Sequence, residues 1–252
     1  MINTINNEDC LETIKRIPKG MVDLVFTSPP YNMNLRIRNG KYCSRQVVDE
    51  FSTKYNGFSD NLPIDDYFDL HLDIIQSLME ISPLVIINFQ VVTGSKRAWF
   101  KIIGELSDYL KDVAVWDKGH GQPAMQSGVI NRATEYLLFF SKEDGISRRF
   151  NQAQFDRGTL SDIWRVPKAR SYSKSHGASM PVDLATKAIE SFTDIGQTIY
   201  DPFGGTGTTA VAASQLGRNF IVSEISQDYC QVIRERLSQS DIFAEMIKDE
   251  TT

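Results

Sequence analysis

A glycine-rich segment near the end of the chain, Gly204 to Gly207, most constrains the fold. It follows a short apolar run, residues 198–200, that is typical of a strand, and it precedes a helical pattern that stops at Gly217. Glycine lets the backbone turn tightly and approach a ligand closely. A strand, a glycine loop and a helix in this order indicate a nucleotide-binding unit within an α/β protein.

Strand and helix patterns alternate along most of the chain, so we expect a single α/β domain, residues 1–252, with a mostly parallel sheet. Residues 33–62 show no clear period, and we expect a mobile insertion there. Residues 141–176 break the alternation and predict a second insertion or a small lobe. The expected strands are residues 22–26, 84–89, 113–116, 136–140, 198–200 and 220–222. The expected helices lie near residues 11–17, 65–78, 98–110, 184–192, 211–216 and 229–237.

The composition is that of an ordinary globular protein of 252 residues, 41% of them hydrophobic, which excludes disorder and coiled coil. The longest apolar stretches fall far short of the roughly 20 residues that span a bilayer, so a soluble, cytoplasmic protein is expected. Cys10, Cys43 and Cys230 are an odd number at wide spacing, so we predict neither a disulfide framework nor a metal site.

The net charge of −5 is unevenly distributed. Residues 142–174 carry eight basic and four acidic side chains, and a second basic group lies within residues 36–45. Either group alone is explained equally well by a solvated charged surface or by contacts to nucleic-acid phosphates. The candidate contacts are Arg36, Arg38, Lys41, Arg45, Arg148, Arg149, Arg157, Arg165, Lys168 and Arg170.

The pattern Gly205-x-Gly207-x-x-Ala210 is followed 17 residues after Gly207 by Glu224, an acid at the end of the next expected strand. Such an acid can accept hydrogen bonds from both hydroxyls of a ribose. Only 45 residues follow Gly207, too few for the second half of a dinucleotide fold, and the loop lacks the Gly-Lys-Ser/Thr ending of a phosphate-binding loop. A ligand with an adenosine and no phosphate chain remains, and S-adenosylmethionine fits.

A second loop, Ser28-Pro29-Pro30-Tyr31, follows the strand at residues 22–26. Two consecutive prolines continue neither a helix nor a strand ladder, so the loop is rigid. The Ser28 hydroxyl and the Pro29 carbonyl can accept the two hydrogens of an exocyclic amino group while Tyr31 stacks on the base. The alternative is a proline-rich turn with a packed tyrosine.

Together, Ser28 to Tyr31 and the later Asp201-Pro202-Phe203-Gly204-Gly205-Thr206-Gly207 resemble the DNA amino-methyltransferases, in the order of their β group. Further similarity includes Asp9-Cys10, Trp116-Asp117-Lys118 and Glu135-Tyr136. The resemblance implies a Rossmann-like S-adenosylmethionine-dependent fold with a seven-stranded sheet and helices on both faces, double-stranded DNA as partner and a target-recognition segment at 141–176. It implies a catalytic loop at Ser28, Pro29, Pro30 and Tyr31, and a cofactor site at Asp9, Asp201, Phe203, Gly204, Gly205, Thr206, Gly207 and Glu224.

The target base is less constrained. Ser28 is typical of N4-cytosine enzymes, whereas the commoner Asp of the family is typical of N6-adenine enzymes; Asn32 after Tyr31 favours adenine. We expect N4 of cytosine by a small margin. Methylation at cytosine C5 is not expected, because no cysteine follows a proline. A nicotinamide-dependent oxidoreductase and a non-catalytic nucleic-acid-binding module are the alternatives from other classes, and a second copy of the chain is a candidate partner.

Overall fold

The computed structural model describes residues 1–32, 62–122, 127–143, 147–168 and 180–249, together with three short strands between residues 36 and 51. Side chains are described up to Gln239, except for Gln122 and the three short strands. These strands, β3 (Arg36–Arg38), β4 (Lys41–Cys43) and β5 (Glu50–Phe51), form a small antiparallel sheet. The expected mobility of residues 33–62 falls largely outside the described residues.

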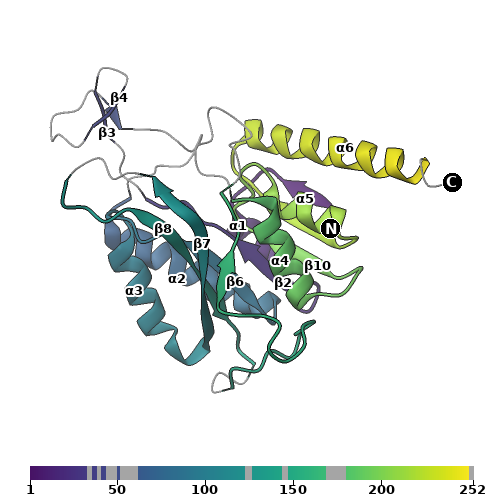
Figure 1. Ribbon diagram of the computed structural model, residues 1–252, viewed down its shortest axis with the longest axis horizontal. Helices are drawn as coiled ribbons and strands as arrows, with labels where there is room; N and C mark the ends of the chain where they lie inside the picture. Colours follow the sequence, from purple (N-terminus) through teal and green to yellow (C-terminus); the bar gives the residue numbers. More distant parts are fainter. Residues whose placement is uncertain are drawn as a thin grey trace.

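The main sheet has eight strands in the order β1-β11-β10-β2-β6-β8-β7-β9 (Figure 1). Five neighbouring pairs are parallel, and the two pairs that β8 makes are antiparallel. The α/β class with a mostly parallel sheet is therefore confirmed. The strands are β1 (Thr4–Asn6), β2 (Leu24–Thr27), β6 (Val85–Phe89), β7 (Leu110–Gln122), β8 (Arg132–Phe140), β9 (Ile163–Arg165), β10 (Thr198–Asp201) and β11 (Asn219–Ser223).

Helices cover both faces of the sheet. Successive side chains of each central strand point to opposite faces, so apolar residues need a covering layer on both. Leu24 and Phe26 point into a core shared with α4, α5 and α6, whereas Val25 points into a core shared with α1, α2 and α3. Figure 1 shows α2 and α3 beside one another, away from α4 and α5. The helices are α1 (Cys10–Arg16), α2 (Ile64–Ile81), α3 (Lys96–Glu105), α4 (Val182–Phe192), α5 (Thr208–Gln215) and α6 (Gln227–Asp249), with a short 3₁₀ turn at Ser107–Tyr109.

The sheet has one strand more than the seven expected. The additional edge strand, β9, pairs in parallel with β7 and turns Trp164 into the core, where Val166 joins it. The segment from 147 to 168 is therefore not a separate lobe, since it packs against the main sheet. The apolar pattern of the sequence did not predict β1, which has only three residues. It predicted a strand of four residues where β7 has thirteen. No helix among the described residues has the length and apolarity needed to cross a membrane.

Candidate active site

Four neighbouring strands end at one edge of the sheet, and each is followed by predicted site residues. In the spatial order β1, β11, β10 and β2, the strands lead to Asp9, to Glu224, to the loop 201–207 and to the loop 28–31. The strands are parallel, so their carboxyl ends meet at the same edge. Ligands of open α/β sheets bind at such an edge.

The loops line one cleft, which is open to solvent. It brings the predicted catalytic loop and nearly all of the predicted cofactor residues together, although the two groups lie far apart in the sequence. Apolar side chains of α2, Leu70 and Ile74, complete one wall. The predicted site residues that line the cleft are Asp9, Ser28, Pro29, Pro30, Tyr31, Asp201, Phe203, Gly204, Gly205, Thr206 and Glu224.

The Glu224 carboxylate is held in place by the backbone. One oxygen accepts a hydrogen bond from Gly205 N at 2.7 Å, and the other accepts from Ser226 N at 2.8 Å. Burial raises the pKa of Glu224, and the two backbone donors oppose that shift. Because an ionised carboxylate accepts up to about four hydrogen bonds, each oxygen keeps acceptor capacity for a ligand in the cleft.

At two glycines of the loop, packing against neighbouring elements leaves no room for a side chain. A Cβ on Gly204 would lie 2.3 Å from Val222 Cγ1 on β11. Gly207 has a φ of +80°, and a Cβ there would lie 2.9 Å from Ile233 on α6. Gly207 is the one predicted cofactor residue that does not line the cleft. It precedes α5 and lets the loop press against α6.

Asp201 lies at the end of β10 and is almost fully buried. Its Oδ1 accepts hydrogen bonds from the Thr27 hydroxyl at 2.6 Å and from Phe203 N at 3.0 Å. Burial raises the pKa of this carboxyl. Since Thr27 immediately precedes Ser28, Asp201 connects the glycine loop with the loop 28–31.

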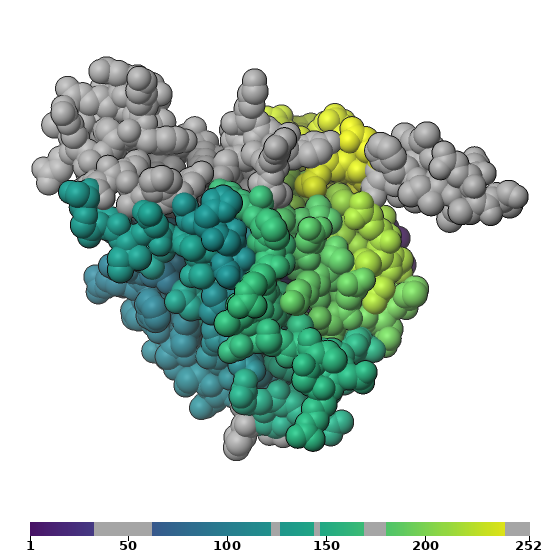
Figure 2. Space-filling model, in the orientation of Figure 1, coloured from purple at the N-terminus to yellow at the C-terminus, as the bar shows by residue number. Residues whose placement is uncertain are grey.

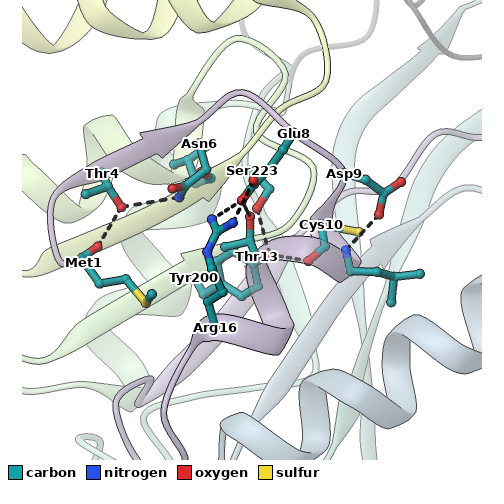
Figure 3. Close-up of polar contacts among 12 residues, drawn as sticks. Met1, Thr4, Asn6, Glu8, Asp9, Cys10, Thr13, Arg16, Tyr200 and Ser223 are labelled. Atoms are coloured by element: carbon teal, nitrogen blue, oxygen red, sulfur yellow. Dashed lines mark hydrogen bonds and ion pairs between the residues drawn. The ribbon is translucent and has the colours of Figure 1, made fainter.

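Asp9 begins α1, where its Oδ1 accepts a hydrogen bond from Leu11 N at 2.8 Å. Below it, the Tyr200 hydroxyl contacts Ser223 Oγ at 2.8 Å and the Cys10 carbonyl at 3.4 Å (Figure 3). These bonds connect β10, β11 and the first turn of α1. Asp9 therefore reaches the cleft from a fixed helix end.

The loop 28–31 is held by hydrogen bonds from several sides. Tyr67 on α2 donates a hydrogen bond to the Pro30 carbonyl at 2.5 Å. The Tyr31 side chain is buried, and its hydroxyl lies 3.1 Å from Ser28 Oγ. Rigid neighbours thus fix the positions of the serine hydroxyl and the tyrosine ring relative to each other.

Three polar residues beneath this loop were not predicted as site residues. Tyr31 donates to Glu135 Oε2 at 2.8 Å, and Asn88 Nδ2 lies 2.8 Å from the same oxygen. Lys118 forms a buried ion pair with Glu135 Oε1 at 3.1 Å. The sequence does contain a signal for them. Asn88 is a polar residue within the apolar run Val85–Phe89, and Lys118 and Glu135 are charged residues within the strands β7 and β8.

Asn32 has a structural role that explains its position after Tyr31. Its φ of +51° lies in the left-handed region, which asparagine tolerates better than most residues. Its Nδ2 donates to the Leu62 carbonyl at 3.0 Å and to the Gly94 carbonyl at 3.2 Å. Asn32 therefore fixes the exit of the catalytic loop.

Comparison with known proteins places this site in a family. The sequence model of the N6/N4 methyltransferase family, described as DNA methylase, matches residues 22–235. The chain belongs to this family of DNA methylases. It is 30% identical to the Type II methyltransferase M.HinfI of Haemophilus influenzae, over 94% of the chain and 69% of that protein. It is 28% identical to M.BamHI of Bacillus amyloliquefaciens, over 95% of the chain and 58% of that protein.

Solved structures share the fold of the methylase. The PvuII DNA methyltransferase, described as cytosine-N4-specific, superposes with a TM-score of 0.69 at 18% identity, covering 92% of this chain and 85% of that one. The M1.HpyAVI–SAM complex gives 0.61 at 22% identity, with 93% and 99% covered. The resemblance found in the sequence is thus confirmed, and a nicotinamide-dependent oxidoreductase is no longer a rival.

The predicted basic contacts of the methylase do not share one surface. Arg165 ends β9 at the edge of the sheet that carries the cleft, 3.9 Å from Asp117, and the exposed Lys168 follows it. Arg148 instead pairs with Asp112, near the start of β7 and hence at the opposite edge.

Arg149 and Arg157 lie near Arg148, at the ends of the strands that point away from the cleft. Arg157 closely follows Phe155, whose ring packs on Phe192 at the end of α4 away from the cleft. In Figure 2 this green part of the chain forms the end of the molecule opposite α6. Only the backbone is described for Arg36, Arg38 and Lys41, and Arg45 and Arg170 lie outside the described residues.

Proposed function

We propose that the methylase transfers a methyl group from S-adenosylmethionine to the exocyclic amino group of a flipped base in double-stranded DNA, N4 of cytosine in preference to N6 of adenine. One observation carries the proposal: the Ser28–Tyr31 loop and the Glu224 carboxylate line the same cleft. An amino group inside a duplex cannot reach such a cleft, so the base must leave the stack.

The residues present fit the cofactor. Glu224 would accept the two ribose hydroxyls with the acceptor capacity that Gly205 N and Ser226 N leave, and Asp9 would hold the adenine. Phe203 and the apolar wall of α2 would lie against the ring. When bound, the cofactor supplies an electrophilic methyl group carried by a sulfonium sulfur.

The loop residues act on the base by positioning it. The Ser28 hydroxyl and the Pro29 carbonyl accept the amino hydrogens, which orients the nitrogen lone pair toward the cofactor part of the cleft. Tyr31 offers a ring that is held in place by its hydroxyl, and stacking on such a ring is worth roughly 1 to 3 kcal/mol. Positioning alone can supply a large part of a rate enhancement.

The preference for cytosine rests on Ser28, a neutral hydroxyl where the commoner family form has a carboxylate. The opposing signal, Asn32, has a structural explanation in its positive φ and its two carbonyl partners. The segment 141–176 is the proposed target-recognition region, and Arg165 and Lys168 are its described basic residues on the cleft side.

The test is methylation of unmethylated bacterial DNA of mixed sequence by the purified chain and S-adenosylmethionine. The DNA is digested to nucleosides, and the modified nucleoside is identified by mass spectrometry. We expect N4-methylcytosine. N6-methyladenine would overturn the choice of base, 5-methylcytosine would overturn the mechanism, and an unmodified digest would favour the non-catalytic binding module.

A further inference from the structure

The Glu135 carboxylate is the centre of a buried polar network beneath the catalytic loop. Three donors converge on it: Lys118 Nζ at 3.1 Å, the Tyr31 hydroxyl at 2.8 Å and Asn88 Nδ2 at 2.8 Å. The Lys118 and Glu135 side chains are only 8% and 9% exposed. An ionised carboxylate accepts hydrogen bonds and cannot donate one, so all three neighbours act as donors toward it.

The carboxylate fixes the direction of the hydrogen bonds above it. Tyr31 has one hydroxyl hydrogen, and it is donated to Glu135. In the 3.1 Å contact between Ser28 Oγ and Tyr31 Oη, serine must therefore be the donor. The serine oxygen, which also lies 3.3 Å from Asn88 Nδ2, then faces the cleft only as an acceptor.

We propose that the Lys118–Glu135 ion pair sets this direction, Ser28 to Tyr31 to Glu135, so that Ser28 can only accept a hydrogen from the substrate amino group. The inference rests on the proposed function and assigns Lys118 and Glu135 as positioning residues. They contact the substrate only through Tyr31 and Ser28.

The free-energy balance of a buried ion pair indicates that the Lys118–Glu135 pair does more than stabilise the fold. Desolvation of two charges commonly cancels their attraction, so a buried pair is weak grounds for a stabilising role. Here the pair ensures that an obligate acceptor lies under Tyr31. Asn88 reinforces the arrangement, because its amide nitrogen faces the same carboxylate oxygen and also lies 3.1 Å from Tyr31 Oη.

The central test is Glu135→Gln. Lys118 holds the amide oxygen of the new side chain, so its NH₂ group faces Tyr31 and donates to the tyrosine oxygen. Tyr31 then donates to Ser28, which occupies one of the two lone pairs of the serine oxygen and frees the serine hydrogen to turn toward the cleft as a donor. We expect kcat to fall about tenfold, as for the loss of one hydrogen bond of about 1.4 kcal/mol, with KM for DNA and for S-adenosylmethionine unchanged.

A double-mutant cycle with Ser28→Ala separates this effect from general damage. Ser28→Ala alone is expected to lower kcat about tenfold, and the combined variant should be no slower than Ser28→Ala. A combined loss near a hundredfold would show that Glu135 acts independently of Ser28 and would overturn the proposal, as would an unchanged kcat in Glu135→Gln.

Two further variants keep the test valid if Glu135→Gln unfolds because the buried Lys118 ammonium loses its negatively charged partner. Tyr31→Phe interrupts the chain without touching a charge, and it should be non-additive with Ser28→Ala in the same way. In Lys118→Met/Glu135→Gln the glutamine can turn its oxygen toward Tyr31, so kcat should recover to within about threefold of the parent. A parent chain that methylates no DNA would refute the proposed function, whereas an active parent with additive variants would refute only the positioning role.

Discussion

His71, on the buried side of α2, predicts a specific dependence of stability on pH. Its Nδ1 lies 2.8 Å from the Tyr67 carbonyl, and its ring stacks between Tyr67 and Phe203. The Nε2 atom is buried without a partner. Burial lowers the pKa of His71 from 6.5 to about 4, which corresponds to roughly 3 kcal/mol at about 1.4 kcal/mol per pH unit.

The direction follows from the two protonation states. Above pH 6.5 the imidazole is neutral in both the native and the unfolded chain, so His71 has no pH effect. Between pH 6.5 and pH 4 the unfolded chain binds a proton that the native chain does not, so the free energy of unfolding falls. Below pH 4 both forms are protonated and the loss stays constant.

The measurement is urea unfolding of the parent and of His71→Phe from pH 7 to pH 4. The phenylalanine keeps the aromatic volume and removes the titration, so the stability of the variant relative to the parent should rise by roughly 3 kcal/mol over this range. His120, which is exposed, provides the matched control, and His120→Gln should follow the parent at every pH. A difference between His71→Phe and the parent that does not change with pH would refute the reasoning.

Two predictions concern ligand contacts. Glu224→Ala should weaken S-adenosylmethionine binding by roughly 2 kcal/mol, the value of charge-assisted hydrogen bonds to the ribose, and calorimetry that finds unchanged affinity would exclude the assigned role. Arg165→Glu/Lys168→Glu should weaken DNA binding and should reduce the slope of log binding constant against log salt concentration by roughly two. The control Arg148→Glu/Arg149→Glu, at the strand ends away from the cleft, should leave the affinity and the slope unchanged. Equal losses in the two variants would contradict the division of the basic residues into two groups.

The two loops of the site could be predicted from the sequence because each is a short continuous motif at the end of a recognisable strand. The charged network could not, because Lys118 and Glu135 meet only through the pairing of β7 with β8, whose register shifts between Asp117 and Gln122. No local pattern encodes such a shift. For a similar reason, charge counted along the sequence does not show that Arg148 and Arg165 lie at opposite ends of the strands.

Asn32 separates the positioning of the loop 28–31 from the length of the segment that follows it. A single side-chain amide holds the carbonyls of Leu62 and Gly94, so the chain leaves the catalytic loop and returns at Leu62 beside the same anchor. We therefore expect changes in length or sequence between residues 32 and 62 to have little mechanical effect on Ser28 and Tyr31. We expect that segments of other methylases can be exchanged between Asn32 and Leu62 while Ser28 and Tyr31 keep their positions.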